Sequence, residues 1–314
     1  SSFFAGILNS NNKFAAAAAA PIILNIILIS SLIISYYLEL DFSKQLSYGV
    51  TLAGLIQLLF LVYVTFKYYK PDLVLNLKLS SKVKFFFRKL LPSILPSGVT
   101  QINILVGTII ASFQSGAVSY LYYADRVYQI NLAIAGIAVG TVSLPVLSKA
   151  FKTKNLKKIS NIQNKSFELS LLLSVPASFG LILASEEIVN ALFGYGSFSK
   201  DDVALTSEAL KYFGFGVPAF ALVKILSNFY FARDNTKTPF YISMLIVILN
   251  ILISVSFFSK IGFIIIPIAT SISTWIGVFI YLYLLNLKKA LLLKDQLIFI
   301  FIKILVSTVL MSLA

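Results

Sequence analysis

Long apolar runs separated by short polar stretches set the pattern of the chain. Runs of about 20 apolar residues, the length that crosses a bilayer as an α-helix, recur from Phe14 onward. A membrane β-barrel would instead show segments of about 10 residues with alternating polarity, which the sequence lacks. We therefore predict membrane-spanning helices at residues 14–37, 46–68, 91–113, 119–147, 166–184, 209–231, 239–258, 263–285 and 296–314.

The polar stretches between these spans differ in character. Residues 67–89 carry seven Lys and Arg side chains among apolar residues at helical spacing, which predicts a basic amphipathic helix on the membrane surface. Residues 185–208 are acidic and polar, and we expect a surface loop with a short helix there. The sequence GFGVP at 214–218 is expected to interrupt the span at 209–231.

Composition excludes a water-soluble fold. Of the 314 residues, 58% are hydrophobic and 12% are charged, and the mean hydropathy is +0.90. Soluble domains average roughly 45–50% apolar and about 25% charged residues, so a soluble fold of this chain would lack polar surface. The predicted fold class is all-α, a polytopic helical membrane protein.

Basic residues alternate between the two sides of the membrane. The loops at 67–89, 149–165, 232–238 and 286–294 hold 7, 6, 2 and 3 Lys or Arg residues. The intervening loops hold three lysines and seven acids. Basic loops of polytopic proteins face the cytoplasm, which puts the tip at 113–117 on the outer side. The same rule accounts for the net charge of +14, and we predict no nucleic-acid partner.

Several residue types are absent. The chain has no cysteine and no histidine, which excludes disulfides, thiol chemistry and the usual zinc ligands. The sequence also lacks paired carboxylates, a Ser/His/Asp set and a phosphate-binding loop. We predict a transporter rather than an enzyme, with no catalytic residue, no bound metal and no cofactor. Because the chain starts within what resembles a helix tail and stops inside an apolar run, we expect it to be part of a longer protein.

Two charged residues, Asp125 and Arg126, lie roughly 10 Å inside the outer end of the span at 119–147. An arginine in the hydrocarbon region costs from about 2.5 kcal/mol upward. One interpretation is a structural ion pair of Asp125 with Arg126 or with another helix. Adjacent residues point roughly 100° apart on a helix, however. We favour an Arg126 that faces a water-filled cavity, where its planar fork suits a phosphate or pyrophosphate.

Further candidates lie near this pair or in another span. The tyrosines at 120, 122, 123 and 128 either form an interfacial belt or line a sugar site. Lys224, midway along the span at 209–231, either contributes a cation to the cavity or extends its ammonium to the membrane surface. Gly136 and Gly140 form a GxxxG pair that predicts close helix packing.

Several motifs resemble those of one transporter family. They are PSGVTQINILV at 96–106, SGAVSYLYYADRVYQ at 115–129, GIAVGTVSLPVLSK at 136–149, LFGYGSF at 192–198 and VKILSNFYFARDNTKTP at 223–239. On these motifs the chain resembles the MurJ (MviN) family of lipid II flippases, in the MOP exporter superfamily, over nearly its whole length. The YYADR and FYFARDNTKTP elements are far more specific than the hydropathy pattern.

The resemblance implies two lobes of six helices that face each other, plus further helices that form a groove for a lipid tail. On that map, residues 1–90 hold the end of the first lobe and a basic cytoplasmic connector. Residues 91–286 hold the complete second lobe, and residues 287–314 hold a connector and the start of the lipid-groove helices. The first helices of the family would lie outside the chain.

The resemblance also implies roles for single residues. Arg126 matches the second lobe's cavity arginine, which holds the pyrophosphate, and Asp125 matches the neighbouring acid. Ser119 matches a cavity-lining serine, whereas Gln129 stands where some relatives carry a glutamate. The full substrate-binding set that we predict is Arg126, Asp125, Ser119, Gln129, Tyr123 and Lys224.

Some relatives bind sodium in the second lobe. The matching positions lack both carboxylates of that site, and we expect no sodium site in this chain. These positions are Gly107, Asn250, Ser254, Ile266 and Thr270.

The implied function is a flippase that moves lipid II, a peptidoglycan precursor linked to undecaprenyl pyrophosphate, across the bacterial inner membrane by alternating access. Energy would come from the membrane potential or an ion gradient. The alternative is another MOP exporter, of lipid-linked oligosaccharides or small molecules. A multidrug exporter would need an acidic cavity, and the second lobe has almost no buried acid beyond Asp125. The expected partners of this multi-pass protein are lipid II and membrane lipids, and we expect a monomer.

Overall fold

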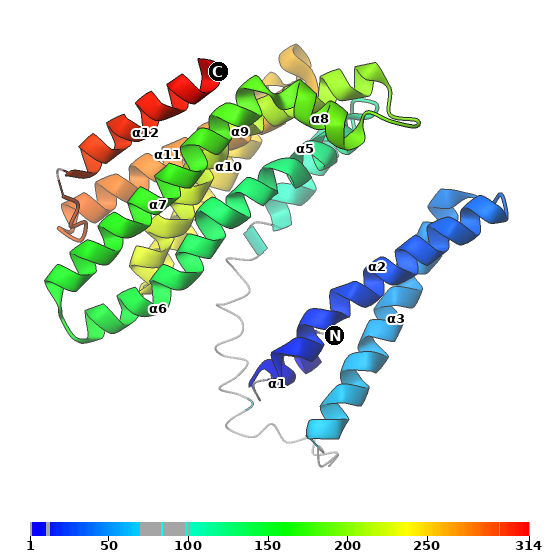
Figure 1. Cartoon of the computed structure of the whole chain (residues 1–314), viewed down its shortest axis with the longest axis horizontal. Coiled ribbons are helices and arrows are strands. Elements are labelled where there is room, and N and C mark those ends of the chain that lie inside the picture. Colours follow the sequence, from blue (N-terminus) through cyan, green and yellow to red (C-terminus); the bar gives the residue numbers. More distant parts are fainter. Residues whose placement is uncertain are drawn as a thin grey trace. The chain divides into compact units, whose positions relative to one another are not determined.

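The computed structural model describes residues 2–10, 13–69, 83, 98–99, 101–294 and 296–313. Within these residues every regular element is helical and none is a strand. The chain forms two compact units, Ser1–Ser80 and Ser81–Ala314 (Figure 1). The all-α prediction is therefore confirmed for the described part of the chain.

Seven helical stretches of the described residues are long and apolar enough to cross a membrane. They are Ala15–Tyr37, Phe42–Tyr68, Ala117–Lys152, Leu156–Leu183, Lys200–Phe231, Lys237–Leu287 and Gln296–Leu313. The stretch at 237–287 contains two of the predicted spans. Of the span predicted at 91–113, the described part includes the helix Gln101–Ala111. The amphipathic helix predicted at 67–89 lies outside the described residues, except for 67–69 and 83.

The first unit holds α1 (Ser2–Ser10), α2 (Phe14–Tyr37) and α3 (Phe42–Tyr68). α2 and α3 form an antiparallel pair (Figure 1). The two helices approach closely at Gly49, where a Cβ would lie 2.5 Å from the Ser31 hydroxyl. The Gln57 amide donates to the Ala20 carbonyl at 2.9 Å and ties the two helices within the apolar region.

α3 begins at Phe42, earlier than the predicted start at residue 46. Asp41 is the reason, because its carboxylate accepts the backbone N–H groups of Ser43 at 2.9 Å and Lys44 at 3.1 Å. Such a cap satisfies donors that the first helical turn leaves free. The polar loop predicted before the span is therefore partly the first turn of the helix.

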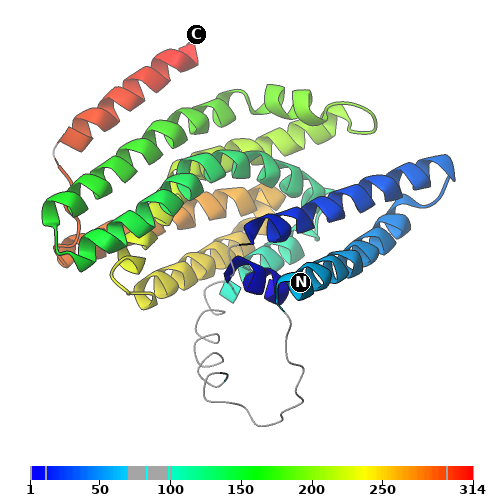
Figure 2. The same ribbon diagram turned by 60° about the horizontal axis from the view of Figure 1, so that its bottom comes forward.

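The second unit is built around α9 (Lys200–Phe231), the most buried of the described spans. α7, α11 and α5 pack along α9, and α12 packs against α7 (Figure 2). The elements other than α9 are α5 (Ala117–Leu132), a π-helical turn (Ala133–Ala138), α6 (Val139–Lys152), α7 (Leu156–Leu183), α8 (Ser185–Phe193), α10 (Lys237–Ile261), a 3-10 turn (Gly262–Ile264), α11 (Ile265–Leu287) and α12 (Gln296–Leu313).

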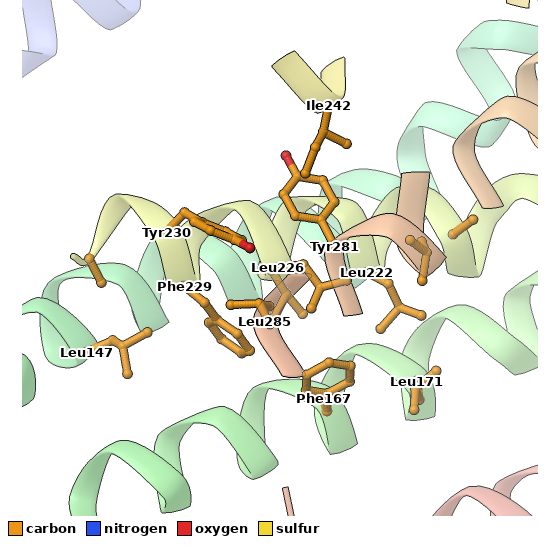
Figure 3. Packing of buried hydrophobic residues seen from close by; sticks show 14 of the residues in the cluster. Leu147, Phe167, Leu171, Leu222, Leu226, Phe229, Tyr230, Ile242, Tyr281 and Leu285 are labelled. Carbon is orange, nitrogen blue, oxygen red and sulfur yellow. The ribbon is translucent and has the colours of Figure 1, made fainter. Parts of the chain in front are cut away.

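Apolar side chains from α7, α9 and α11 interdigitate in the core of this unit (Figure 3). The rings of Phe167 and Phe229 lie 5.8 Å apart between centroids, and Leu226 and Leu285 are fully buried beside them. Lipid tails are as apolar as these side chains, so close packing rather than removal from water stabilises the contact in a membrane.

α9 continues through the GFGVP segment, and the predicted interruption at 214–218 is wrong. Pro218 has no N–H to offer the Gly214 carbonyl, and the Ser178 hydroxyl of α7 donates to that carbonyl at 2.7 Å instead. The indole of Trp275 on α11 donates to the neighbouring Phe215 carbonyl at 3.0 Å. Donors from two adjacent helices thus replace the missing backbone bond and keep the helix intact.

α7 begins at Leu156, ten residues before the predicted start at 166. The basic loop predicted at 149–165 is therefore mostly helical, and its turn is limited to residues 153–155. The Asn155 side chain caps α7 by accepting the N–H of Lys158 at 2.9 Å. Ile159 and Gln163 face the core, while the lysines at this end of α7 are exposed. The polar stretch is therefore an amphipathic helix and not a loop.

α9 also begins earlier than predicted, at Lys200 instead of residue 209. Ser199 and Asp202 form a reciprocal capping box: the Asp202 N–H donates to the Ser199 hydroxyl, and the Ser199 N–H donates to the Asp202 carboxylate. The surface loop predicted at 185–208 contains the expected short helix, α8. Its last nine residues belong to α9.

Between α11 and α12 the chain forms a connector at 290–294 that side chains of α7 hold by its backbone. We call these contacts the connector clasp. Ser160, Gln163 and Asn164 lie within about one turn of α7, on the same face of the helix, and all three bind this segment. The bonds are Ser160 Oγ to Leu292 O (2.7 Å), Asn164 Nδ2 to Leu292 O (2.8 Å), Gln163 Nε2 to Ala290 O (3.1 Å), Leu292 N to Gln163 Oε1 (2.9 Å) and Lys294 N to Asn164 Oδ1 (2.9 Å).

Candidate functional site

The candidate site begins at the turn that leads into α5. Gly116 has a φ of +75°, and a Cβ there would lie 2.6–2.9 Å from atoms of the Tyr120 ring, so this position requires glycine. The Gln114 side chain accepts the N–H of Phe263 at 2.9 Å. This bond ties the turn to the 3-10 turn before α11 and holds the start of α5.

α5 buries one face and leaves the opposite face uncovered by its own unit. Ala117, Ala124 and Val127 are buried against the core. The side chains opposite them recur at intervals of three and four residues, which places them on one line along the helix. All are exposed, and we call this set the open face: Ser119, Tyr122, Arg126 and Gln129.

Arg126 lies at the centre of the open face. Its guanidinium stacks on the Tyr122 ring at 4.6 Å from the centroid, and one terminal nitrogen donates to the Tyr122 hydroxyl at 3.0 Å. Both contacts come from the preceding turn of the same helix. A guanidinium has five N–H donors in a fixed fork, so this arrangement orients the side chain and leaves most of its donors available to a ligand.

Asp125 turns away from Arg126 and is held by another partner. Its carboxylate accepts a hydrogen bond from the Gln129 amide, one turn further along α5. The Tyr128 ring stacks on Phe213 of α9 at 4.7 Å between centroids. Asp125 is thus engaged within its own helix, and among the described residues no hydrogen bond or ion pair joins it to Arg126.

Tyr123 does not belong to the open face. Its ring packs against Phe193, the last residue of α8, at 4.8 Å and against Phe198, in the loop that follows α8, at 5.4 Å. The aromatic residue beside Arg126 is instead Tyr122, which is 54% exposed. The sequence offered one signal for it, since residues four apart on a helix face each other. Next to this cluster, the Tyr120 hydroxyl donates to Asp202 at 2.9 Å and joins α5 to α9.

The GxxxG pair brings α9 against the π-helical turn and α6. A Cβ at Gly136 would lie 3.1 Å from the Ala221 backbone. One at Gly140 would lie 2.9 Å from the Asn228 amide, which donates to the Gly140 carbonyl at 2.8 Å. The close packing predicted for this pair is confirmed.

Lys224 lies at the level of Gly140 and not at the level of Arg126. A Cβ at Gly140 would lie 3.4 Å from Cγ of Lys224. Gly140 follows Arg126 by fourteen residues in the sequence, about 21 Å along the helix axis at 1.5 Å per residue. Of the six predicted substrate-binding residues, Ser119, Arg126 and Gln129 thus share the open face, while Lys224 lies well apart from them.

The positions that match the sodium site of some relatives do come together. The Asn250 amide donates to Asn103 Oδ1 at 3.0 Å and to the Thr270 hydroxyl at 3.2 Å, and the Ser254 hydroxyl donates to Asn250 at 3.2 Å. These groups are neutral and satisfy one another. Within the described residues, no group of three or more His, Cys, Asp or Glu side chains is placed to hold a metal ion.

A groove of about 810 Å³ lies on the other side of α9, between α7, α11 and α12. Apolar side chains form most of its wall, including Phe179, Phe215, Trp275 and Phe301. The donors that repair the α9 backbone, Ser178 and Trp275 among them, also line it. The groove suits a hydrocarbon chain, whereas the open face suits an anion.

The arrangement on α5 can bind but is not built to break bonds. An arginine in a fixed pose, with a hydroxyl and an amide on the same face, can hold the oxygens of a phosphate or pyrophosphate. On this face no nucleophile is paired with a general base.

The sequence profile of the Lipid II flippase MurJ family matches residues 1–314. The chain is 37% identical over 287 residues to the probable lipid II flippase MurJ of Rhizobium meliloti (strain 1021), which covers 88% of this chain and 52% of the relative. It is 36% identical over 279 residues to the probable lipid II flippase MurJ of Rickettsia prowazekii (strain Madrid E), with 88% and 54% covered. The chain thus spans about half the length of the curated relatives it matches.

Two solved structures are similar in fold. Lipid II flippase MurJ in its inward closed conformation gives a TM-score of 0.81 at 28% identity, with 99% of this chain and 63% of that chain covered. An inward-facing multidrug resistance MATE family transporter of the MOP superfamily gives a TM-score of 0.77 at 14% identity, with 91% and 66% covered. At that identity, the second likeness shows the fold alone.

Proposed function

The chain belongs to the lipid II flippase MurJ family, and from this membership we propose that it is part of a flippase that moves lipid II across the bacterial inner membrane. One of the motifs that predicted the family, SGAVSYLYYADRVYQ at 115–129, contains all four residues of the open face. The proposed transporter makes and breaks no covalent bond in its substrate. It acts as a multi-pass membrane protein.

One observation carries the proposal: Arg126 is exposed on a helix within a membrane span and oriented by Tyr122, and its guanidinium makes no hydrogen bond to Asp125. A charge of this kind is expensive in hydrocarbon and is stable only where water or an anion reaches it. The substrate supplies such an anion in its pyrophosphate. Ser119 and Gln129 offer further hydrogen bonds along the same line.

In the proposed mechanism the open face forms one wall of a cavity that opens first to the cytoplasm and then to the outer side. Arg126 holds the pyrophosphate through charge-assisted hydrogen bonds, which exceed neutral ones in strength about twofold. The lipid tail stays in the membrane. Tyr122 keeps the guanidinium in its pose while the cavity changes its opening.

An exporter of cationic drugs is a poorer match for this face. Such a transporter needs an accessible acid, and the half-buried carboxylate of Asp125 is already engaged by Gln129. An exporter of another lipid-linked oligosaccharide would use the same pyrophosphate contact. Purified lipid precursors with different sugars, compared as competitors for binding, would separate these substrates.

The test is the Arg126→Ala substitution in the full-length protein, expressed in a strain depleted of other lipid II flippase activity. We expect growth to be lost while the protein accumulates in the membrane at its normal level. Asn161→Ala, at an exposed position of α7, serves as the control and should support growth. Normal growth with a well-expressed Arg126→Ala protein would show the proposal to be wrong.

A further inference from the structure

The middle of α9 is built from residues that favour a bend. Gly214, Gly216 and Pro218 follow one another at alternate positions inside this helix. Glycine and proline are poor helix formers in a helix interior, and proline also leaves the carbonyl four residues earlier without a backbone donor. Sharp kinks in helices occur mainly at such positions. The unbroken path of α9 through residues 214–218 therefore needs support from outside the helix.

This support comes from α7 and α11. Ser178 of α7 and Trp275 of α11 donate to two consecutive carbonyls of the segment, at 2.7 and 3.0 Å. Ser271 of α11 donates to the Tyr212 carbonyl, just before the segment, at 2.8 Å. A backbone carbonyl left without a donor in a membrane is costly. The unbroken form of α9 thus depends on where α7 and α11 hold these three donors.

A second irregular turn lies beside the segment. The π-helical turn Ala133–Ala138 joins α5 to α6, and a Cβ at its Gly136 would lie 3.1 Å from the Ala221 backbone of α9. Ala221 follows Pro218 by three residues, about 4.5 Å along the axis. π-helical turns are rare, frequent at functional sites and a recognised cause of kinks. Two helices that pack side by side therefore have their irregular turns at nearly the same level (Figure 1).

The Tyr128 ring of α5 covers the segment from the side opposite to the donors. It packs on Phe213, just before the segment, at 4.7 Å between centroids, and on Phe220, just after it, at 5.4 Å. A bend at 214–218 changes the angle between these two rings, and the tyrosine that contacts both has to follow. Tyr128 lies two residues after Arg126, so the open face is joined to this segment by direct packing.

We propose that residues 214–218 of α9 and the π-helical turn at 133–138 form a paired hinge within the second unit. The outer parts of α5 and α9 tilt together about it, relative to the cytoplasmic part that holds α6 and the end of α9. Donors from α7 and α11 hold the hinge unbent, and Tyr128 carries the bend to α5. The use of the hinge in transport rests on the proposed function, because the tilt moves Arg126 within its own unit.

The first test measures the tilt itself. Val118 is 40% exposed at the outer end of α5, and Asn161 is exposed at the cytoplasmic end of α7. The chain contains no cysteine, so Val118→Cys and Asn161→Cys supply two spin-label sites in the full-length protein, with any cysteine outside the chain replaced by serine. Rigid rocking of the unit leaves the distance between the labels unchanged. A kink of about 20° at a hinge roughly 22 Å away displaces the label at position 118 by up to about 8 Å.

The distances would be measured by double electron–electron resonance in lipid nanodiscs. We expect two distances without substitution in α9, or one distance that shifts when lipid II is added. Pro218→Ala restores the backbone donor to the Gly214 carbonyl and should give a single distance that lipid II does not change. A single distance that lipid II leaves unchanged even with Pro218 present would overturn the hinge. A shift of the same size in Pro218→Ala would also overturn it, because the bend would then lie elsewhere.

The second test asks whether transport needs the hinge. Pro176 is the matched control, because it also lies inside a helix, α7, and outside the hinge. In proteoliposomes we expect Pro218→Ala to lower lipid II transport about tenfold without lowering the thermal unfolding midpoint, since alanine is the better helix former. Pro176→Ala should stay near the native rate, and an equal loss in both variants would count against the hinge.

The Arg126→Ala variant separates this inference from the proposed function. A native rate for Pro218→Ala together with no transport by Arg126→Ala would overturn the role of the hinge and leave the proposed function in place. Native transport by Arg126→Ala would overturn the proposed function, and the distances between the spin labels would still decide whether the unit bends at this place.

Discussion

Arg126 and Arg233 make almost the same local contacts and serve opposite purposes. Each guanidinium stacks on an aromatic ring, Arg126 on Tyr122 at 4.6 Å and Arg233 on Phe151 at 4.5 Å. Each also donates one hydrogen bond. The acceptor for Arg126 lies on its own helix, whereas Arg233, in the turn after α9, donates to the Ala290 carbonyl of the connector at 2.5 Å.

The surroundings of the two residues explain the difference. Arg233 is half-buried beside the connector clasp, and this burial lowers the pKa of its guanidinium from the usual range. Its guanidinium joins three segments that are far apart in the sequence: the turn after α9, Phe151 of α6 and the connector at Ala290. Arg126 is exposed, and among the described residues its hydrogen bond and ring contact stay within α5. A paired arginine that bridges segments stabilises the fold, and an oriented arginine that bridges none is available to a ligand.

The largest expected effect comes from replacing each of the two arginines by alanine in turn and comparing transport with stability. Arg126→Ala should lower lipid II transport about 100-fold or more, because two charge-assisted hydrogen bonds contribute about 3–5 kcal/mol. The thermal unfolding midpoint in detergent should stay within about 1 °C of the native value, since the side chain supports no other segment. Proteoliposome transport and a thermal unfolding scan would be measured on the same preparation.

Arg233→Ala is the mirror of this experiment. We expect it to lower the unfolding midpoint by several degrees and to leave the transport rate per folded molecule near the native rate. If Arg126→Ala destabilised the protein as much as Arg233→Ala did, the contrast between the two residues would be lost, and Arg126 would be a structural residue.

The connector clasp should show the next largest effect, on stability alone. Gln163 is 0% exposed, donates to Ala290 and accepts from Leu292. Gln163→Ala leaves the Leu292 N–H without its partner, at about 1–3 kcal/mol, while the Ala290 carbonyl keeps the bond from Arg233. The variant should lower the unfolding midpoint by about 2–10 °C. Asn161→Ala, at an exposed position two residues earlier, is the control and should change it by less than about 1 °C. An unchanged midpoint for Gln163→Ala would mean that the clasp does not hold α12 in place.

The two regions also differ in how far the sequence could predict them. Arg126 was predicted as a cavity residue because a charge within an apolar run stands out by itself. The clasp gave no such signal, since its polar residues lie in a lysine-rich stretch that reads as a loop. Its bonds join residues 127–132 positions apart, and hydropathy carries no information about contacts at that range.

Tyr123 and Tyr122 illustrate the same limit within one motif. Both are adjacent aromatic residues in YYADR, and Tyr123 was predicted for the substrate site. Which of them is free depends on Phe193 and Phe198, which cover Tyr123 from another segment. In the same way, the helix break predicted from GFGVP does not occur, because Ser178 and Trp275 donate hydrogen bonds to the carbonyls of Gly214 and Phe215. Local sequence patterns predict the helices well, whereas contacts with residues far away in the sequence decide which side chains stay exposed.

A smaller effect is expected where Tyr122 orients Arg126. Tyr122→Leu removes both the ring and the hydroxyl, and it should lower lipid II affinity about three- to tenfold, because an exposed cation–π contact contributes about 0.5–1 kcal/mol and the hydrogen bond a similar amount. Tyr122→Phe keeps the ring and loses only the hydroxyl, and should lower affinity by less than about threefold. Binding would be measured by titrating lipid II into the detergent-solubilised protein.

The background of this experiment decides its meaning. In Arg126→Lys, the ammonium has no planar fork for Tyr122 to align, so Tyr122→Phe should add no further loss there. An equal loss in both backgrounds would show that Tyr122 contacts the substrate itself, and the pose of Arg126 would then need another cause. A loss that disappears with Arg126→Lys places Tyr122 as a positioning residue, and it separates the open face, where one residue prepares another for a ligand, from the connector clasp, where every contact ends on the protein.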